Sequence, residues 1–141
     1  MKWYFASRVR HQSKIIEISR FLVDLGETVV SDWVHKGSLK PYSENLSEVQ
    51  IFSEEVVRSL LSADIFVLIS DPEGTDMFVE LGVCLAHNSL TQKPRIYIVG
   101  EHSKRSIMQL HPSVIHAKDI IEVFKFEGIE TRNFVPVDFT A

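Results

Sequence analysis

The run "DIFVLIS" at residues 64–70 decides the fold. It is apolar between its end residues over the length of a strand, which is typical of a central parallel strand covered on both faces. In "SDPEGTDMFVELGVCLAH", residues 70–87, turn-forming residues then give way to a helical pattern that begins at Asp76. A strand, a turn and a helix in this order indicate one unit of an α/β protein.

The same alternation of apolar strands and amphipathic helices extends along the chain in both directions. Strands are predicted at residues 2–6, 27–33, 94–100 and 113–117, and helices at residues 13–26, 46–62 and 118–126. Right-handed crossovers place such helices on both sides of a sheet. We therefore predict a single α/β domain over residues 1–141, a Rossmann-like or flavodoxin-like open five-stranded parallel sheet with helices on both faces, and an irregular tail at residues 126–141.

The composition argues against several classes of protein. The chain has 141 residues, 45% of them hydrophobic, and a net charge of −4 without runs of like charge, so no nucleic-acid polymer is expected as a partner. No apolar run approaches the roughly 18 residues of a membrane span, and the first residues lack the apolar stretch of a signal peptide. The single cysteine, Cys84, excludes an internal disulfide, and a cytoplasmic location is expected. No histidine shows metal-ligand spacing, so neither a metal nor a cofactor is expected.

Two polar turns mark the expected binding site, because ligands of open α/β sheets bind at the carboxyl ends of the strands, where the strand order reverses. They are "ASRVR" at residues 6–10 and "SDPEGT" at residues 70–75. In the first turn Ser7, Arg8 and Arg10 form a cradle for a phosphate monoester, with ordinary surface cations as the alternative interpretation of the arginines. Neither a Walker motif nor a Rossmann glycine triplet occurs, so triphosphates and dinucleotides are disfavoured.

Glu80 is the strongest candidate for chemistry on the helix that follows the second turn. Apolar residues flank it on both sides, and it lies near a helix N-terminus that Thr75 is expected to cap. A solvated helix face is the ordinary interpretation of a single glutamate. A carboxylate among apolar neighbours is also suited to act as a nucleophile, and displacement at an anomeric carbon fits it well, because that transition state resembles an oxocarbenium ion.

Three segments together resemble the nucleoside 2-deoxyribosyltransferase superfamily, which includes the 2′-deoxynucleoside 5′-monophosphate N-glycosidases. They are "YFASRVR" at residues 4–10, "SADIFVLIS" at residues 62–70 and "VELGVCLAHNSLTQKPRIYIV" at residues 79–99. The resemblance covers the chain from residue 2 to about residue 100.

The resemblance implies a role for each of the residues that match. Glu80 would attack C1′ of the sugar to give a glycosyl-enzyme intermediate, and Tyr4 would orient Glu80 through its hydroxyl. The 5′-phosphate would be held by Ser7, Arg8 and Arg10. In the transferases the C-terminus of one subunit reaches the neighbouring active site, which implies a homodimer or a larger homo-oligomer.

The acid of the family has no direct counterpart in this chain. Family glycosidases often carry an aspartate on the helix before the third strand, and Val56 occupies that position here. Asp71 and Asp76 are the candidates to replace it, with Asp71 assigned as the catalytic residue. Their alternative roles are those of a turn residue and of a charge at a helix N-terminus.

The remaining predicted contacts are with the substrate. The turn formed by Gly74 and Thr75, with Asp76 beside it, is expected to line the sugar pocket. Trp33, after the second strand, either stacks on the base or belongs to the core.

Three functions remain open at this point. The first is hydrolysis of the N-glycosidic bond of (deoxy)nucleoside 5′-monophosphates through Glu80. The second is transfer of deoxyribose between bases, and the third is nucleotide binding without catalysis. All three require a small-molecule nucleotide or nucleoside as the partner.

Overall fold

The computed structural model of the chain describes residues 1–140 and confirms the predicted α/β architecture. Its strands are β1 (Lys2–Ala6), β2 (Thr28–Val29), β3 (Ile65–Ile69), β4 (Arg95–Val99) and β5 (Val114–Ala117). Its α-helices are α1 (Gln12–Asp24), α2 (Leu46–Ser62), α3 (Asp76–Thr91) and α4 (Ile120–Phe126). Neighbouring strands all pair in parallel, in the order β2-β1-β3-β4-β5. The order reverses between β1 and β3, where sheets of this kind bind ligands.

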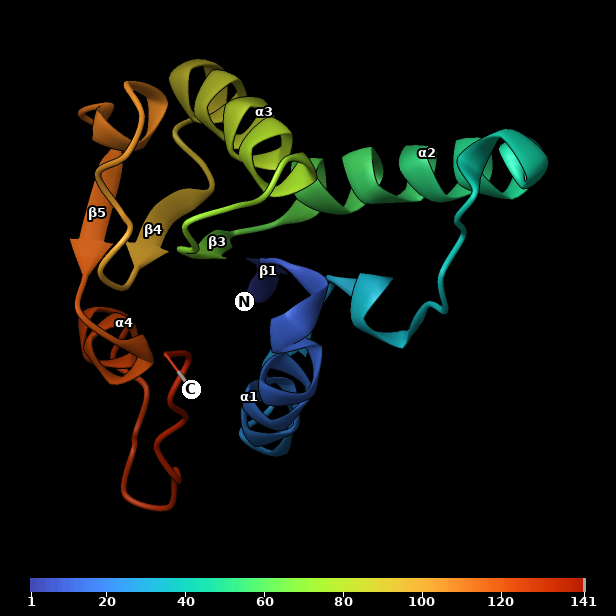
Figure 1. Ribbon diagram of the computed structural model, residues 1–141. Helices are drawn as coiled ribbons and strands as arrows, with labels where there is room; N and C mark the ends of the chain where they lie inside the picture. Colours follow the sequence, from blue (N-terminus) through green and yellow to red (C-terminus); the bar gives the residue numbers. More distant parts are fainter. Residues whose placement is uncertain (141) are drawn as a thin grey trace.

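The sheet separates two hydrophobic cores (Figure 1). Helices α1 and α4 cover one face, and α2 and α3 cover the other. Alternate residues of β1 serve the two cores: Trp3 and Phe5 pack under α1 and α4, whereas Tyr4 packs under α2 and α3. All five residues of β3 are buried, because this central strand is covered on both sides. Burial on both faces of the sheet explains why the sequence of β3 is a continuous apolar run.

Strand β2 is shorter than the predicted strand at residues 27–33. It ends at Val29, and a 3-10 helix follows at Asp32–His35. Side chains explain the early end, because they occupy the main-chain groups that a longer strand would pair with. The hydroxyl of Ser31 accepts the backbone N–H of Phe5 at 3.1 Å, and the indole of Trp33 donates to the Phe5 carbonyl at 2.7 Å. The chain is thereby fixed against the carboxyl end of β1.

The segment after α4 forms no helix or strand up to residue 140, and it packs on its own chain between α4 and α1 (Figure 1). The ring of Phe134 lies 4.8 Å from that of Phe21 and 5.2 Å from that of Phe124, between centroids. Phe139 meets the ring of His11 edge-on at 5.3 Å. These contacts place the aromatic side chains of the tail on the core beneath α1 and α4 of the same subunit.

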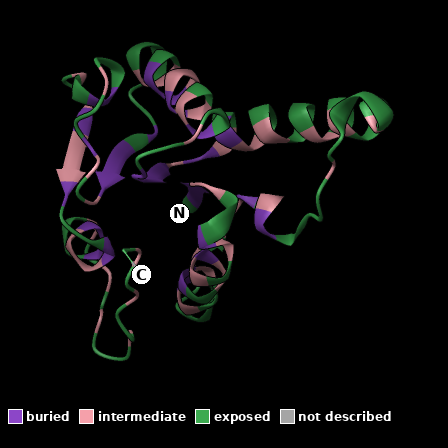
Figure 2. Ribbon diagram, in the orientation of Figure 1, coloured by how far each residue is buried: buried purple, intermediate pink, exposed green. Residues whose placement is uncertain are grey.

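Helix α2 extends well beyond the sheet, and its outer half carries mostly exposed residues (Figures 1 and 2). Along the whole helix, four large apolar residues are between 44% and 61% exposed: Leu46, Ile51, Val57 and Leu61. No helix within residues 1–140 is both long and apolar enough to cross a bilayer.

Candidate active site

The carboxyl ends of β1 and β3 bring most of the predicted site residues together. The turn after β1 and the loop after β3 are joined by two ion pairs. Arg8 Nη1 lies 2.8 Å from Glu73 Oε2, and Arg10 Nε lies 2.7 Å from Asp71 Oδ2. Both pairs link segments more than sixty residues apart in the sequence. The two turns that the sequence singled out therefore lie against each other.

Tyr4 and Glu80 lie close together on the α2–α3 side of the sheet. Tyr4 is almost completely buried and stacks on Phe66, with ring centroids 6.0 Å apart. Its hydroxyl is near enough to lower the pKa of Glu80, but the geometry falls short of a full hydrogen bond. Within residues 1–140, neither Tyr4 Oη nor the buried Glu80 Oε2 has a hydrogen-bond partner. Such atoms cost free energy, which a ligand that supplied the partners would recover.

Burial is the main reason that the pKa of Glu80 rises from 4.5 to about 7. The Tyr4 hydroxyl lowers this pKa, and the negative charge of Asp76, one helical turn earlier, raises it, but both effects are smaller. A carboxyl group with a pKa near 7 is more basic than an ordinary glutamate and still ionises at neutral pH. Both properties suit a nucleophile or a general base.

Asp71 is surrounded by hydrogen-bond donors and only 1% exposed. Its Oδ2 accepts from Arg10 at 2.7 Å and lies 3.1 Å from His11 Nε2, while Oδ1 accepts the backbone N–H of Glu73 at 3.0 Å. Burial alone would raise the pKa of Asp71, but these hydrogen bonds outweigh it and the pKa is lowered. The carboxylate is therefore deprotonated at neutral pH. This geometry argues against Asp71 as the catalytic acid and for a role in holding Arg10 and His11.

The first turn contains the three residues predicted to bind a phosphate: Ser7, Arg8 and Arg10. A ligand can reach them, and each already makes a contact within the chain. The Ser7 hydroxyl donates to the carbonyl of Arg8 at 2.8 Å. The side chains of Arg8 and Arg10 are 38% and 48% exposed, so a ligand can reach both guanidinium groups. An anion bound here would compete with Glu73 for Arg8, because Glu73 is itself largely exposed.

The loop before α3 places three of the predicted substrate contacts at the helix start. Gly74 has φ +123°, and a Cβ there would lie 2.5 Å from Met77 Cε, so glycine alone fits without rearrangement. Helix α3 begins at Asp76, with Thr75 at the N-cap position as predicted, but the Thr75 hydroxyl caps no backbone N–H. Thr75 and Asp76 are both exposed and face solvent at this end of the sheet.

Trp33 has a structural role in this arrangement. Its indole nitrogen donates to Phe5, and its partly buried ring packs against both hydrophobic cores. Of the two interpretations of Trp33 from the sequence, the geometry favours the core residue over the stacking platform for a base.

Two residues of the site were not singled out by the sequence. His11 is 2% exposed and bonded to Asp71, and its pKa is lowered, mainly by burial. No local sequence pattern signals this contact, because His11 and Asp71 are 60 residues apart in the chain. Asp32 is exposed at the carboxyl end of β2. Burial is the largest cause of the raised pKa of Tyr4, and the charges of Glu80 and Asp32 add to it. In the sequence, Asp32 could have been recognised as a site residue from its position at the carboxyl end of a strand.

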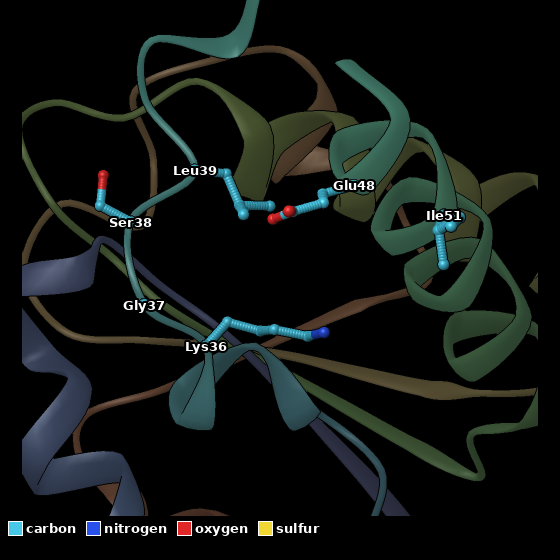
Figure 3. A pocket seen from close by; sticks show the side chains of 6 residues that line it. All are labelled: Lys36, Gly37, Ser38, Leu39, Glu48 and Ile51. Atoms are coloured by element: carbon cyan, nitrogen blue, oxygen red, sulfur yellow. The ribbon is translucent and has the colours of Figure 1, made fainter. Parts of the chain in front are cut away.

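A hollow of about 460 Å³ lies outside this group of residues (Figure 3). It lies between α2 and the segment that follows the 3-10 helix Asp32–His35. Its lining includes Lys36, Leu39, Glu48 and Ile51. None of the predicted site residues lines it. Within residues 1–140, no group of three or more His, Cys, Asp or Glu side chains is arranged to hold a metal ion.

A solved structure is similar to this chain over most of its length. No protein-family model and no curated protein matches the chain. The solved structure of the CMP N-glycosidase BcmB from Clostridium botulinum is similar to 92% of this chain and to 100% of its own, with a TM-score of 0.57 and 15% sequence identity. The chain shares its fold with a CMP N-glycosidase. The fold that the resemblance implied is thus confirmed.

Glu80→Gln is expected to stabilise the protein at alkaline pH. Because folding raises the pKa of Glu80, the folded protein binds this proton more tightly than the unfolded chain. The resulting stabilisation is complete below about pH 4.5 and is lost as the pH rises through about 7. Glutamine does not ionise, so the free energy of unfolding of the variant should exceed that of the wild type by about 2–3 kcal/mol at alkaline pH, and should differ little near pH 4.5.

Urea unfolding at the two pH values, followed by tryptophan fluorescence, measures this difference. Glu17→Gln, an exposed position on α1, is the matched control and should change stability little at either pH. An equal effect of Glu80→Gln at both pH values would contradict the raised pKa.

Proposed function

We propose that this protein hydrolyses the N-glycosidic bond of (deoxy)nucleoside 5′-monophosphates through a glycosyl-enzyme intermediate on Glu80. The observation that carries the proposal is a buried Glu80 oxygen that receives no hydrogen bond from residues 1–140. It lies beside the Tyr4 hydroxyl, where the strand order reverses. The arginines of the neighbouring turn support a phosphorylated substrate. The shared fold with a CMP N-glycosidase supports the reaction class.

In the first step, an oxygen of Glu80 forms a bond to C1′ while the bond from C1′ to the base nitrogen breaks. The electron pair of the broken bond leaves with the base. A carboxylate in a poorly solvated position stabilises the positive charge that develops on the sugar. Tyr4 lies beside the attacking carboxylate, and its ring stacks on Phe66, so its hydroxyl is positioned to orient Glu80 when a substrate binds.

In the second step, water attacks C1′ and the bond between C1′ and Glu80 breaks. The carboxylate is regenerated, and the sugar phosphate leaves with the hydroxyl group from water. Two displacements at the same carbon retain its configuration.

Asp76 is our candidate for giving a proton to the departing base in the first step and for taking the proton that water loses in the second. It is exposed, and it lies one helical turn from Glu80, close enough for its charge to raise the pKa of that residue. Asp71 instead anchors Arg10 and His11, as its lowered pKa and its donors require.

The 5′-phosphate is assigned to the turn after β1. Arg8 would exchange Glu73 for the phosphate, while Arg10 stays oriented by Asp71. Charge-assisted bonds of this kind are roughly twice as strong as neutral ones. A nucleoside lacks the group that would use them, so this subsite favours nucleotide hydrolysis over nucleoside transfer.

Incubation with a panel of ribo- and deoxynucleosides and their 5′-monophosphates, CMP included, tests the function. We expect release of free base without any acceptor base, faster from monophosphates than from nucleosides. Glu80→Gln should reduce the rate by about a thousandfold or more, because the nucleophile is lost, whereas Glu17→Gln should leave it unchanged. Chromatography of the base measures each reaction.

The other outcomes of this panel are equally definite. Product that forms only when an acceptor base is present would replace the hydrolase with a transferase. Equal binding of nucleotides by the wild type and Glu80→Gln, without turnover by either, would make the protein a binding module.

Tyr4→Phe is expected to move the pH dependence of kcat/KM. Activity should rise with pH as Glu80 ionises near pH 7. The Tyr4 hydroxyl lowers the pKa of Glu80, so its removal should shift this acidic limb to higher pH. Tyr97→Phe is the control, since that hydroxyl bonds Glu127 and faces the opposite core. An unshifted limb in Tyr4→Phe would contradict the assigned role.

We also propose a homodimer in which a second copy covers α2. Leu46, Val57 and Leu61 recur at helical spacing on one side of this helix, and all three are exposed. Val79 on α3, next to Glu80, is 67% exposed as well. Apolar positions gathered in this way are typical of protein–protein contacts.

Light scattering coupled to size exclusion measures the assembly. The wild type should have twice the chain mass of 16.1 kDa, and Val57→Glu should be monomeric. Ile107→Glu, an equally apolar exposed position in the segment after β4, should remain dimeric. A monomeric wild type would refute the dimer.

A further inference from the structure

We propose that Arg105 is a third arginine of the phosphate subsite, and that it contributes to the preference for 5′-monophosphates over nucleosides. The inference rests on the proposed function for the identity of the ligand. Arg105 belongs to the β4–β5 loop, residues 100–113, which contains none of the site residues predicted from the sequence. The loop follows the carboxyl end of β4, the strand beside β3.

Arg105 reaches the same residue that holds the other two arginines. Its Nη1 donates to the main-chain carbonyl of Asp71 at 3.2 Å. The carboxylate of Asp71 binds Arg10 at 2.7 Å and lies 3.7 Å from Arg8 Nη1. Guanidinium groups from two separate loops therefore converge on one residue at the end of β3.

The charges at this point are not balanced. Arg8 and Arg10 are faced by two carboxylates, those of Asp71 and Glu73. In the part of the chain that the structure describes, no carboxylate forms an ion pair with Arg105. Three cations and two anions leave an excess of one positive charge, since the lowered pKa of His11 keeps that ring neutral. An anion is the ligand that this excess favours.

A fully buried amide holds the main chain of Arg105 in place. Gln109 is 0% exposed, and its Oε1 accepts the backbone N–H of Arg105 at 2.8 Å and the hydroxyl of Ser106 at 3.3 Å. Its Nε2 donates to the carbonyl of His102 at 3.1 Å. A satisfied buried amide of this kind rigidifies the segment that it bonds.

The β4–β5 loop is also attached to the strand that carries Asp71. Ser70 Oγ accepts the backbone N–H of His102 at 3.2 Å. Gly100 makes this approach possible, because it has φ +104° and a Cβ there would lie 2.7 Å from Ser70 Oγ. The position of Arg105 relative to Asp71 is therefore set by the fold before any ligand binds.

Phosphate is the anion that this arrangement suits best. Arginine presents five N–H donors in a rigid planar fork, and only one contact of the Arg105 fork is made within residues 1–140. Its side chain is exposed, so the other donors can meet two oxygens of a phosphate at once. A fixed guanidinium loses little freedom on binding.

Binding in a Glu80→Gln background tests the proposal without turnover. The probes are CMP, cytidine and inorganic phosphate, titrated by calorimetry or by NMR. Adding Arg105→Ala should weaken the binding of CMP by about tenfold or more. It should weaken the binding of phosphate to a similar extent and leave the binding of cytidine unchanged. Arg105→Lys should restore part of the loss. Lys104 is an exposed cation next to Arg105 in the sequence. Adding Lys104→Ala instead should leave the affinities for all three probes as they are in Glu80→Gln alone.

Each result bears on one proposal or the other. Equal CMP and phosphate affinity with and without Arg105 would overturn the assignment, as would a background that binds neither probe. If the wild type binds CMP through Arg105 but releases no base from any nucleotide, the proposed hydrolysis is wrong and the subsite stands. If base is released and Arg105→Ala leaves the KM for nucleotides unchanged, the hydrolysis stands and the subsite is wrong.

Discussion

The buried carboxylate of Asp71 is the contact on which the site depends. Its oxygens hold Arg10 and His11 from the turn after β1 and the backbone of its own loop, and its carbonyl receives Arg105 from the β4–β5 loop. Loss of the carboxylate would leave buried donors unpaired and would release two loops at once. Three segments remote in the sequence are thus placed by one residue at the end of the central strand.

Two carboxyl groups on this end of the sheet have opposite properties because their surroundings differ. Asp71 has several donors and a lowered pKa, whereas Glu80 lies among apolar groups and has a raised one. Neither property follows from residue type, since burial acts on both and hydrogen bonds decide the outcome. This difference suits Asp71 to electrostatic anchoring and Glu80 to the bond formation that we propose for it.

The sequence predicted what depends on local patterns. The apolar run of β3, the helical repeats and the N-cap position of Thr75 all lie where they were expected. The predicted length of β2 was wrong, because Ser31 and Trp33 bond Phe5 across more than twenty residues. The state of Asp71 and the position of Arg105 depend on partners more than thirty residues away. No periodicity reports contacts of that kind.

The attachment of Ser31 and Trp33 to Phe5 has a consequence for how such a protein can diversify. Both main-chain groups of Phe5 are satisfied before the chain leaves the sheet toward α2. The connection that follows, residues 36–45, contributes no strand, so its length and composition can change while the sheet beneath it stays intact. Selection for a different ligand can act on this connection at little cost in stability, while Tyr4 and Glu80 keep their places.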